Sequence, residues 1–284
     1  MAAFKAAVDI GAHAVETDLH LSKDGVVVLS HDATLKRCFG KEEKIADCDW
    51  SYLSTLETLL EPRQGLPRLS DLLEYLAQPG LESVWVLLDI KTDDPAEDLL
   101  SATAQTLASV PTARPWNQRI VLGGWNENYI QLCREYLPTF PVAYIGFSLV
   151  YARRFLKQPG VNFNLLQQML VGPVGAQFMK KVRKAQRSLF VWTVNSEAWM
   201  EWSIRKQVDG VITDDPKLFL EVCERWKTEG RGRARKTVKM YAIAFFWQVV
   251  ATVFIVLHYR WLNSRGKRRD VPVGIGRQEV LVKT

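Results

Sequence analysis

The chain has 284 residues, 48% hydrophobic and 24% charged, enough to bury a large core, and a barrel of about 250 residues would fit within it. The net charge is +6, but the segment from Trp226 onward carries 13 Lys and Arg against three Asp and Glu, which leaves −4 for the remainder. Basic charge confined to a tail argues against nucleic-acid binding and for a membrane flank. Four cysteines without ligand spacing, and no signal-peptide pattern, indicate a reducing compartment.

Strand-like runs alternate with helical patterns along residues 1–226, which predicts an α/β fold with a parallel sheet. The expected strands are Ala14–Leu19 with an extension at Val26–Leu29, Ser83–Ile90, Arg119–Gly123, Val142–Phe147, Asn162–Leu166, Leu189–Val194 and Gly210–Thr213. The expected helices are Leu69–Leu76, Ala96–Leu107, Glu127–Leu137, Leu149–Lys157, Val174–Arg187, Glu197–Lys206 and Pro216–Trp226. Seven strand positions predict a (β/α)8 TIM-type barrel that lacks its first strand, because the chain opens on an apolar helical stripe.

The C-terminal region contains twenty residues, Met240–Tyr259, without Asp, Glu, Lys or Arg. At 1.5 Å each they would span a hydrocarbon core of about 30 Å. A buried amphipathic helix would show a polar stripe, yet only Gln248, Thr252 and His258 interrupt the run. The pattern predicts a single-pass anchor over 240–259 in an intracellular membrane, between a basic linker (227–239) and a basic tail (260–284) suited to anionic lipid headgroups.

Two carboxylates two residues apart are the first candidate site. In a strand, Glu16 and Asp18 share a face, and two hard oxygen ligands suit Mg²⁺ or Ca²⁺. The turn sequence from Ser22 to Gly25 leads into a second β-branched run that ends at the His31-Asp32 pair. Taken alone, the carboxylates are as compatible with a solvated face, and the histidine with a structural role.

The combination is more specific. The run Gly11-Ala12, Glu16-x-Asp18, Lys23-Asp24-Gly25, His31-Asp32 and Leu35-x-Arg37 resembles the signature of the glycerophosphodiester phosphodiesterase family. Leu88-Asp89-Ile90-Lys91, Trp192-Thr193-Val194-Asn195 and Asp209–Pro216 resemble its later strand ends, in order. With its C-terminal segment, the chain is most similar to membrane-anchored fungal members that cleave phosphatidylglycerol in a phospholipase C manner.

The resemblance implies that Glu16, Asp18 and Asp89 bind one divalent cation, which polarises a phosphate oxygen. The family usually has Glu where this sequence has Asp89, so the third ligand is one methylene shorter. Lys91 is expected to supply positive charge to the phosphate; the alternative is a lysine paired with a neighbouring carboxylate.

The resemblance also implies that His31 is a catalytic proton carrier. The family uses a second histidine, in a His-Arg-Gly strand end that this sequence does not contain. Two explanations are open: a gene model that begins at an internal Met, which we favour, or a degenerate member. His20 shares parity with Glu16 and Asp18, but its expected place in a loop favours a surface role, and His13 has no better claim.

Aromatic side chains at other strand ends offer substrate contacts. Trp192, with Asn195, and Trp125 are candidates to line a pocket for a glycerol or acyl-glycerol group, with core packing as the alternative for both tryptophans. Asp214 and Asp215 are expected to cap the following helix rather than to touch metal.

The sequence therefore predicts a metal-dependent hydrolase of glycerophospholipids that converts phosphatidylglycerol to diacylglycerol and glycerol phosphate. Hydrolysis of soluble or lyso-type glycerophosphodiesters is the alternative activity. A non-catalytic lipid-binding protein is the alternative of a different class, because the second histidine is missing. For the chain as written we expect poor catalysis and low stability.

Overall fold

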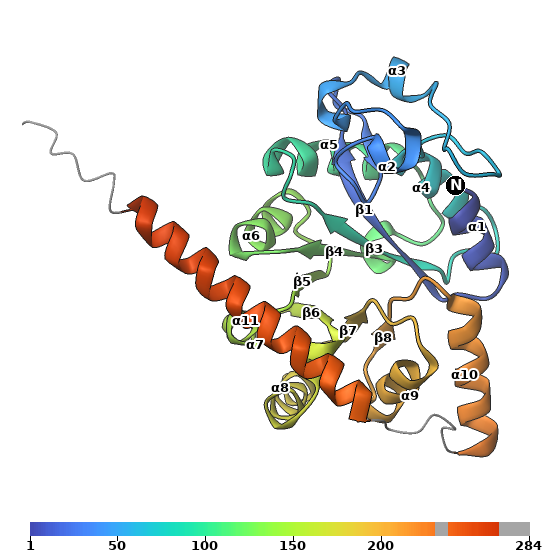
Figure 1. Cartoon of the computed structure of the whole chain (residues 1–284). Helices are drawn as coiled ribbons and strands as arrows, with labels where there is room; N and C mark the ends of the chain where they lie inside the picture. Colours follow the sequence, from blue (N-terminus) through green and yellow to red (C-terminus); the bar gives the residue numbers. More distant parts are fainter. Residues whose placement is uncertain (231–237, 267–284) are drawn as a thin grey trace, which may run out of the picture.

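One curled sheet of eight strands forms the centre of the molecule, with helices on its outer face (Figure 1). The structure is a computed structural model that describes residues 1–230 and 238–266, without the side chains of residues 239 and 254–266. The sheet order is β2-β1-β3-β4-β5-β6-β7-β8, and all pairs are parallel except β1 with β2. The strands are β1 (Ala14–Leu21), β2 (Val27–Leu29), β3 (Trp85–Ile90), β4 (Ile120–Gly124), β5 (Val142–Gly146), β6 (Val161–Leu166), β7 (Leu189–Trp192) and β8 (Gly210–Val211).

Helices alternate with the parallel strands along the chain, as the pattern predicts, with α1 before the first strand and α10 after the last. They are α1 (Ala2–Asp9), α4 (Leu69–Leu76), α5 (Ala96–Ser109), α6 (Glu127–Tyr136), α7 (Leu149–Phe155), α8 (Pro173–Lys184), α9 (Glu197–Lys206) and α10 (Pro216–Glu229), with short 3-10 turns η2 (Trp116–Gln118) and η3 (Gln167–Leu170). Two of these helices, α4 and α9, have the predicted bounds. The ends of α5, α6, α7, α8 and α10 differ by a few residues from the predicted ones, because helix ends fray, and α1 covers the N-terminal apolar stripe, for which no bounds were predicted.

β1 and β2 form the hairpin that the turn sequence predicts. The Ser22 hydroxyl donates to Asp24 Oδ1 at 2.6 Å and accepts from Val26 N at 2.8 Å, while Gly25 takes a positive φ of 85°. A residue with a Cβ rarely adopts that conformation, so glycine suits this position. The hairpin returns the chain to the end of β1, where Ser30 N donates to Asp18 O at 3.1 Å.

The segment between β2 and α4 contains structure that the sequence pattern did not predict. It folds into α2 (Lys36–Phe39), η1 (Ile45–Asp47) and α3 (Trp50–Leu53), which surround a small apolar core of their own. These elements are each a single turn, too short for periodicity to identify.

The sheet is open between β1 and β8 within the part of the chain that the structure describes. β1 pairs with β3 and, at its far end, with β2, while β8 pairs with β7 alone. The seven parallel strands confirm the predicted α/β fold as a partial barrel of the TIM type. Apolar side chains fill both faces: a large cluster packs between strands and helices, and Leu87, Ile145 and Phe190 form a smaller one.

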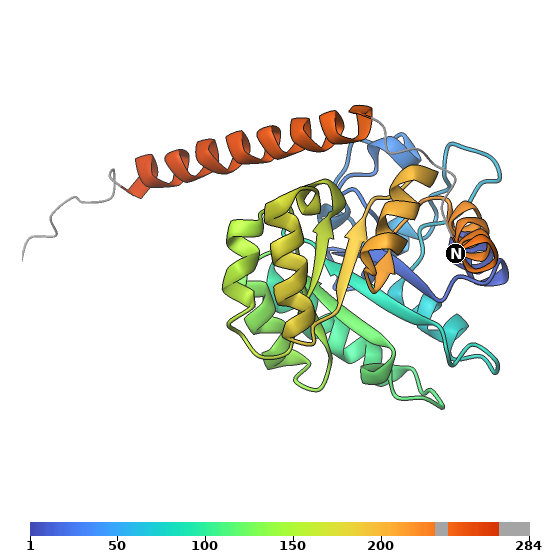
Figure 2. The same cartoon turned by 90° about the horizontal axis from the view of Figure 1, so that it is seen from below.

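The C-terminal helix α11 (Val238–Gly266) packs against η3, and its far end extends beyond the barrel (Figures 1 and 2). The Gln248 amide donates to the carbonyls of Gln168 and Val171 at 2.9 and 3.1 Å, and Met240, Ala244 and Ala251 are buried. This contact ties the first half of α11 to η3.

Among the described residues, no helix is both long and apolar enough to cross a membrane. The structure thus gives no support to the predicted span Met240–Tyr259, although the side chains from residue 254 onward lie outside the described residues. Parts of the predicted linker (231–237) and tail (267–284) also lie outside them. The division of the chain into barrel, linker, anchor and tail stays a prediction.

Candidate active site

Three carboxylates converge at the carboxyl ends of β1 and β3. The parallel pairing places Asp18 beside Asp89, and Glu16 lies two residues earlier on the same face of β1. Glu16, Asp18 and Asp89 each offer an oxygen within 4.8 Å of the others. The predicted metal ligands are therefore together, and Asp89 reaches the cluster despite its shorter side chain.

Lys91 lies among these carboxylates. Its Nζ is 2.6 Å from Asp18 Oδ1 and 3.2 Å from Asp89 Oδ2. Burial lowers the pKa of Lys91, but the charges of Asp89 and Asp18 more than offset this and hold its pKa above the usual value. The ammonium is therefore charged and paired with neighbouring carboxylates, which is the alternative that the sequence left open.

One ammonium does not balance three carboxylates. Burial, followed by the charges of Asp18 and Asp89, raises the pKa of Glu16 to about 8, and Asp214 adds to the rise. Burial also raises the pKa of Asp89, against the opposing charge of Lys91. A divalent cation would relieve this repulsion, and carboxylate oxygens are the ligands that Mg²⁺ and Ca²⁺ prefer. The residues present therefore fit a divalent cation.

Two tryptophans stand beside the cluster. Trp125 follows β4 and donates from Nε1 to Asp89 Oδ1 at 2.7 Å. Its ring meets that of Trp192, at the end of β7, edge to face with centroids 6.0 Å apart. Both side chains are half-buried, so they pack against the inner core and still border the site.

His31 lies just after β2, at the end of the hairpin opposite to the turn. The residue before it, Ser30, donates from its backbone N–H to the carbonyl of Asp18. Its side chain is 71% exposed, and Nδ1 is 2.9 Å from Asp32 Oδ1. Asp32 also accepts from Arg37 Nε at 2.6 Å, and these two bonds, first Arg37 and then His31, lower the pKa of Asp32 to about 2. An ionised Asp32 therefore orients the imidazole at neutral pH.

The expectation of a surface role for His20 was wrong. His20 lies within β1, which is longer than predicted, and its side chain is buried with Nδ1 2.7 Å from Asp94 Oδ2. The pair joins β1 to the loop after β3. His13 is exposed before the start of β1, at the opposite end of the strand from the carboxylates.

The loop after β8 contributes Asp214, which we expected from the sequence to cap the following helix together with Asp215. Asp215 caps α10 as predicted, since its side chain accepts from Leu218 N at 3.0 Å. Asp214 instead accepts from Asn195 Nδ2 at 2.6 Å, and its charge acts on Glu16. No sequence spacing relates Asp214 to Glu16, because curling of the sheet brings them near each other.

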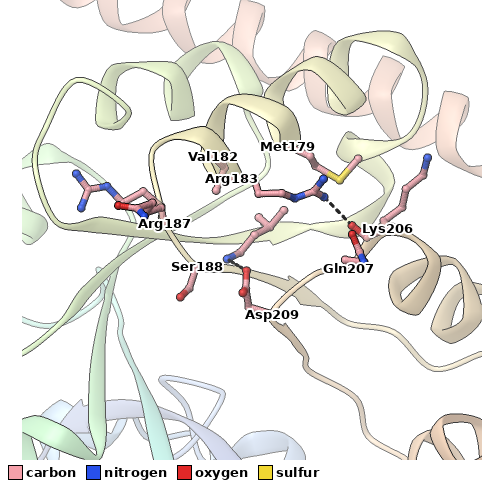
Figure 3. Close-up of a pocket in the computed structure, with 10 residues that line it drawn as sticks. Met179, Val182, Arg183, Arg187, Ser188, Lys206, Gln207 and Asp209 are labelled. Atoms are coloured by element: carbon pink, nitrogen blue, oxygen red, sulfur yellow. Dashed lines mark hydrogen bonds between the residues drawn. The ribbon is translucent and has the colours of Figure 1, made fainter. Parts of the chain in front are cut away.

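A cavity of about 340 Å³ lies elsewhere, at the amino ends of β7 and β8 (Figure 3). Arg183 donates to the carbonyl of Lys206 at 3.0 Å there, and Asp209 accepts from Leu189 N at 2.8 Å. Its basic residues stand at the carboxyl ends of α8 and α9, where cations stabilise the exposed carbonyls. This cavity is therefore explained by helix capping and is separate from the carboxylate cluster.

Comparison with known proteins agrees with the geometry. The sequence model of the glycerophosphoryl diester phosphodiesterase family matches residues 1–218. The chain belongs to this family. It is thus a glycerophosphodiester phosphodiesterase, an enzyme that hydrolyses phosphoric diesters.

Individual relatives are distant. A glycerophosphodiester phosphodiesterase from Caldanaerobacter subterraneus is 22% identical over 237 residues, which cover 79% of this chain and 91% of that protein. A solved structure of a putative family member from Silicibacter pomeroyi has a TM-score of 0.70 at 18% identity, over 81% of this chain and 88% of that one. An Oleispira antarctica phosphodiesterase, solved in complex with the product sn-glycerol-3-phosphate, has a TM-score of 0.66 at 18% identity, covering 77% and 88%. The similarity to these two solved structures supports the fold described above for this chain.

The raised pKa of Glu16 generates a prediction for the cation-free enzyme. A carboxyl group whose pKa is higher in the folded than in the unfolded state holds its proton longer when folded, so stability falls as pH rises from about 4.5 to about 8. Glu16→Gln removes that loss. In EDTA we expect Glu16→Gln to raise Tm at pH 8 by about 5 °C and to leave Tm at pH 4.5 nearly unchanged, measured by calorimetry. An equal Tm for wild type and variant at pH 8 would contradict the electrostatic account of the cluster.

Proposed function

We propose that this phosphodiesterase acts on glycerophospholipids and hydrolyses phosphatidylglycerol to diacylglycerol and glycerol phosphate. The observation that carries the proposal is the cluster of Glu16, Asp18 and Asp89 with Lys91 at the carboxyl ends of β1 and β3. Carboxyl ends of strands are where (β/α) barrels place their active sites.

Each residue of the cluster has a defined task in this reaction. Glu16, Asp18 and Asp89 would hold Mg²⁺ or Ca²⁺, which when bound neutralises charge on the phosphate. Lys91 binds a second phosphate oxygen through its ammonium. Before substrate binds, the ammonium is held beside the cluster by Asp18 and Asp89. Together they orient the diester and stabilise the negative charge that builds up on its oxygens.

His31 is the residue that transfers protons in this reaction. Hydrolysis forms a P–O bond to the oxygen of water and breaks the P–O bond to the diacylglycerol, so water must lose a proton and the departing alkoxide must gain one. Asp32, which also accepts from Arg37, holds the ring through Nδ1 and leaves Nε2 for this exchange. Exposure of His31 to solvent allows the ring to be reprotonated between turnovers.

The preference for a lipid rests on the C-terminal helix and on the resemblance to fungal members. Phe245, Phe246 and Trp247 are exposed on α11, although most large apolar side chains of the barrel are buried. Basic residues flank this helix on both sides in the sequence. We place the enzyme at an intracellular membrane, with anionic headgroups as partners of these residues.

A lyso-type substrate is the second candidate. One observation favours it: a lysophospholipase D from Rattus norvegicus is 47% identical to this chain over a short stretch of 53 residues, 19% of this chain and 17% of that protein. Trp125 and Trp192 offer apolar surface beside the carboxylates that either an acyl-glycerol or a glycerol group would contact.

The carboxylate cluster is tested by Asp18→Ala. Loss of one ligand from a three-carboxylate site should abolish cation-dependent hydrolysis of phosphatidylglycerol in detergent micelles with Mg²⁺ or Ca²⁺, and EDTA should do the same to the wild type. Glu135→Ala, an exposed carboxylate on α6, is the matched control and should retain full activity. Wild-type turnover that persists in EDTA would contradict a cation-dependent mechanism. Parallel assays with lysophosphatidylglycerol and glycerophosphoglycerol rank the substrates.

His31→Ala tests the proton carrier. We expect kcat to fall by about 10² to 10⁴, the usual contribution of a general acid or base. His13→Ala serves as the control, because His13 is exposed at the opposite end of β1. If His31→Ala keeps more than about a tenth of wild-type kcat, another group carries the proton.

Membrane association is tested by flotation of the full chain with vesicles. The chain should float with vesicles of phosphatidylglycerol, and replacing Phe245, Phe246 and Trp247 together by Ser should reduce the bound fraction several-fold, because less apolar area is buried in lipid. The control replaces Val150 and Val174, exposed apolar residues on α7 and α8, by Ser. A wild-type chain that remains unbound would rule out the proposed partner.

A further inference from the structure

The third carboxylate of the cluster is held at both of its oxygens. Oδ1 of Asp89 accepts from Trp125 Nε1 at 2.7 Å, and Oδ2 accepts from Lys91 Nζ at 3.2 Å. The side chain is buried, with 4% of the residue exposed. The carboxylate therefore cannot turn about its terminal torsion without breaking one of these bonds, although that torsion is otherwise soft.

Trp125 is itself fixed in place. Its ring lies edge to face against Trp192, at an interplanar angle of 65°, and Trp192 donates from Nε1 to Asn164 O at 3.2 Å. The Lys91 ammonium stands 5.7 Å from the Trp125 ring centroid, a favourable cation–π distance. The indole N–H is thus anchored through β7 and β6 and aimed at a single oxygen.

The two donors to Asp89, Lys91 and Trp125, respond differently to a cation bound nearby. Lys91 carries a positive charge, so a divalent cation bound to Asp18 and Asp89 repels it and weakens its hold on Oδ2. The indole N–H is uncharged, so a cation held by the Asp89 carboxylate would not repel it, and its bond to Oδ1 can persist. Aspartate has one methylene fewer than glutamate. The Asp89 carboxylate can therefore reach a shared cation from fewer orientations than a glutamate could.

We infer that Trp125 is a positioning residue for the cation site: its indole N–H fixes the Asp89 carboxylate in the orientation that binds a divalent cation. The inference rests on the proposed cation site and adds to it a residue from the loop that follows β4. Hydrogen-bond donors that orient a ligand commonly change metal affinity by about 10- to 100-fold.

The test is calorimetric titration of the full chain with Mn²⁺, a substitute for Mg²⁺ that also gives an electron paramagnetic resonance signal when free. Trp125→Phe keeps an aromatic ring and removes the N–H, and we expect its affinity for Mn²⁺ to fall about tenfold. Trp125→Gln replaces the ring but supplies an amide donor, and should recover part of the loss. The Tm of each variant in EDTA shows whether the fold is retained.

Trp116→Phe is the matched control. The Trp116 indole donates to Val110 O at 2.8 Å, a buried bond of the same kind far from the carboxylates, so its loss should leave Mn²⁺ affinity unchanged. In an Asp89→Asn background, Trp125→Phe should cause no further loss, because the two residues act through one interaction.

The outcomes separate this inference from the proposed function. Mn²⁺ binding by the wild type with unchanged affinity in Trp125→Phe overturns the positioning role and leaves the cation site standing. Equal losses in Trp125→Phe and Trp125→Gln, with lowered Tm for both, would assign Trp125 to packing alone and also overturn it. Absence of Mn²⁺ binding by the wild type overturns the cation site and this inference with it.

Discussion

Repulsion among Glu16, Asp18 and Asp89 is the interaction on which the active site depends. Three carboxylates approach within 4.8 Å, and among the described residues the ion pairs to Asp18 and Asp89 all come from one basic side chain, Lys91. Burial, followed by the charges of Asp18 and Asp89, raises the pKa of Glu16. Such an arrangement lowers the stability of the cation-free fold, and it is retained where a cation and a phosphate restore the balance.

Strand register produces this convergence. Parallel pairing sets Asp18 beside Asp89, and the β1–β2 hairpin brings Ser30, and with it the start of the His31 motif, to the backbone of Asp18. From the other side of the open sheet, the charge of Asp214 reaches Glu16. The edges β1 and β8 therefore approach each other at the active-site end although they do not pair in the described residues. Curvature of the sheet thus assembles one site from strands far apart in the sequence.

Local patterns were sufficient to predict the strands, the partial barrel and the shared face of Glu16 and Asp18, because alternation in a strand fixes which residues share a face. Asp89 joined the predicted ligands only through the resemblance to the family. Local patterns failed where a partner comes from another strand. His20 was expected at the surface, yet it is buried against Asp94, and Asp214 was assigned to a helix cap. The bond from Trp125 to Asp89 joins β4 to β3 and leaves no trace in either segment alone. Apolar length alone predicted a membrane span that the described part of α11 does not support.

The most direct test of the account is a crystal structure of the enzyme soaked with Mn²⁺, read from anomalous scattering. The account predicts one peak between Glu16, Asp18 and Asp89, about 2.0 to 2.3 Å from an oxygen of each, with Lys91 displaced from Asp18. A map in which Lys91 still bridges Asp18 and Asp89 and no peak lies among the three carboxylates would contradict it.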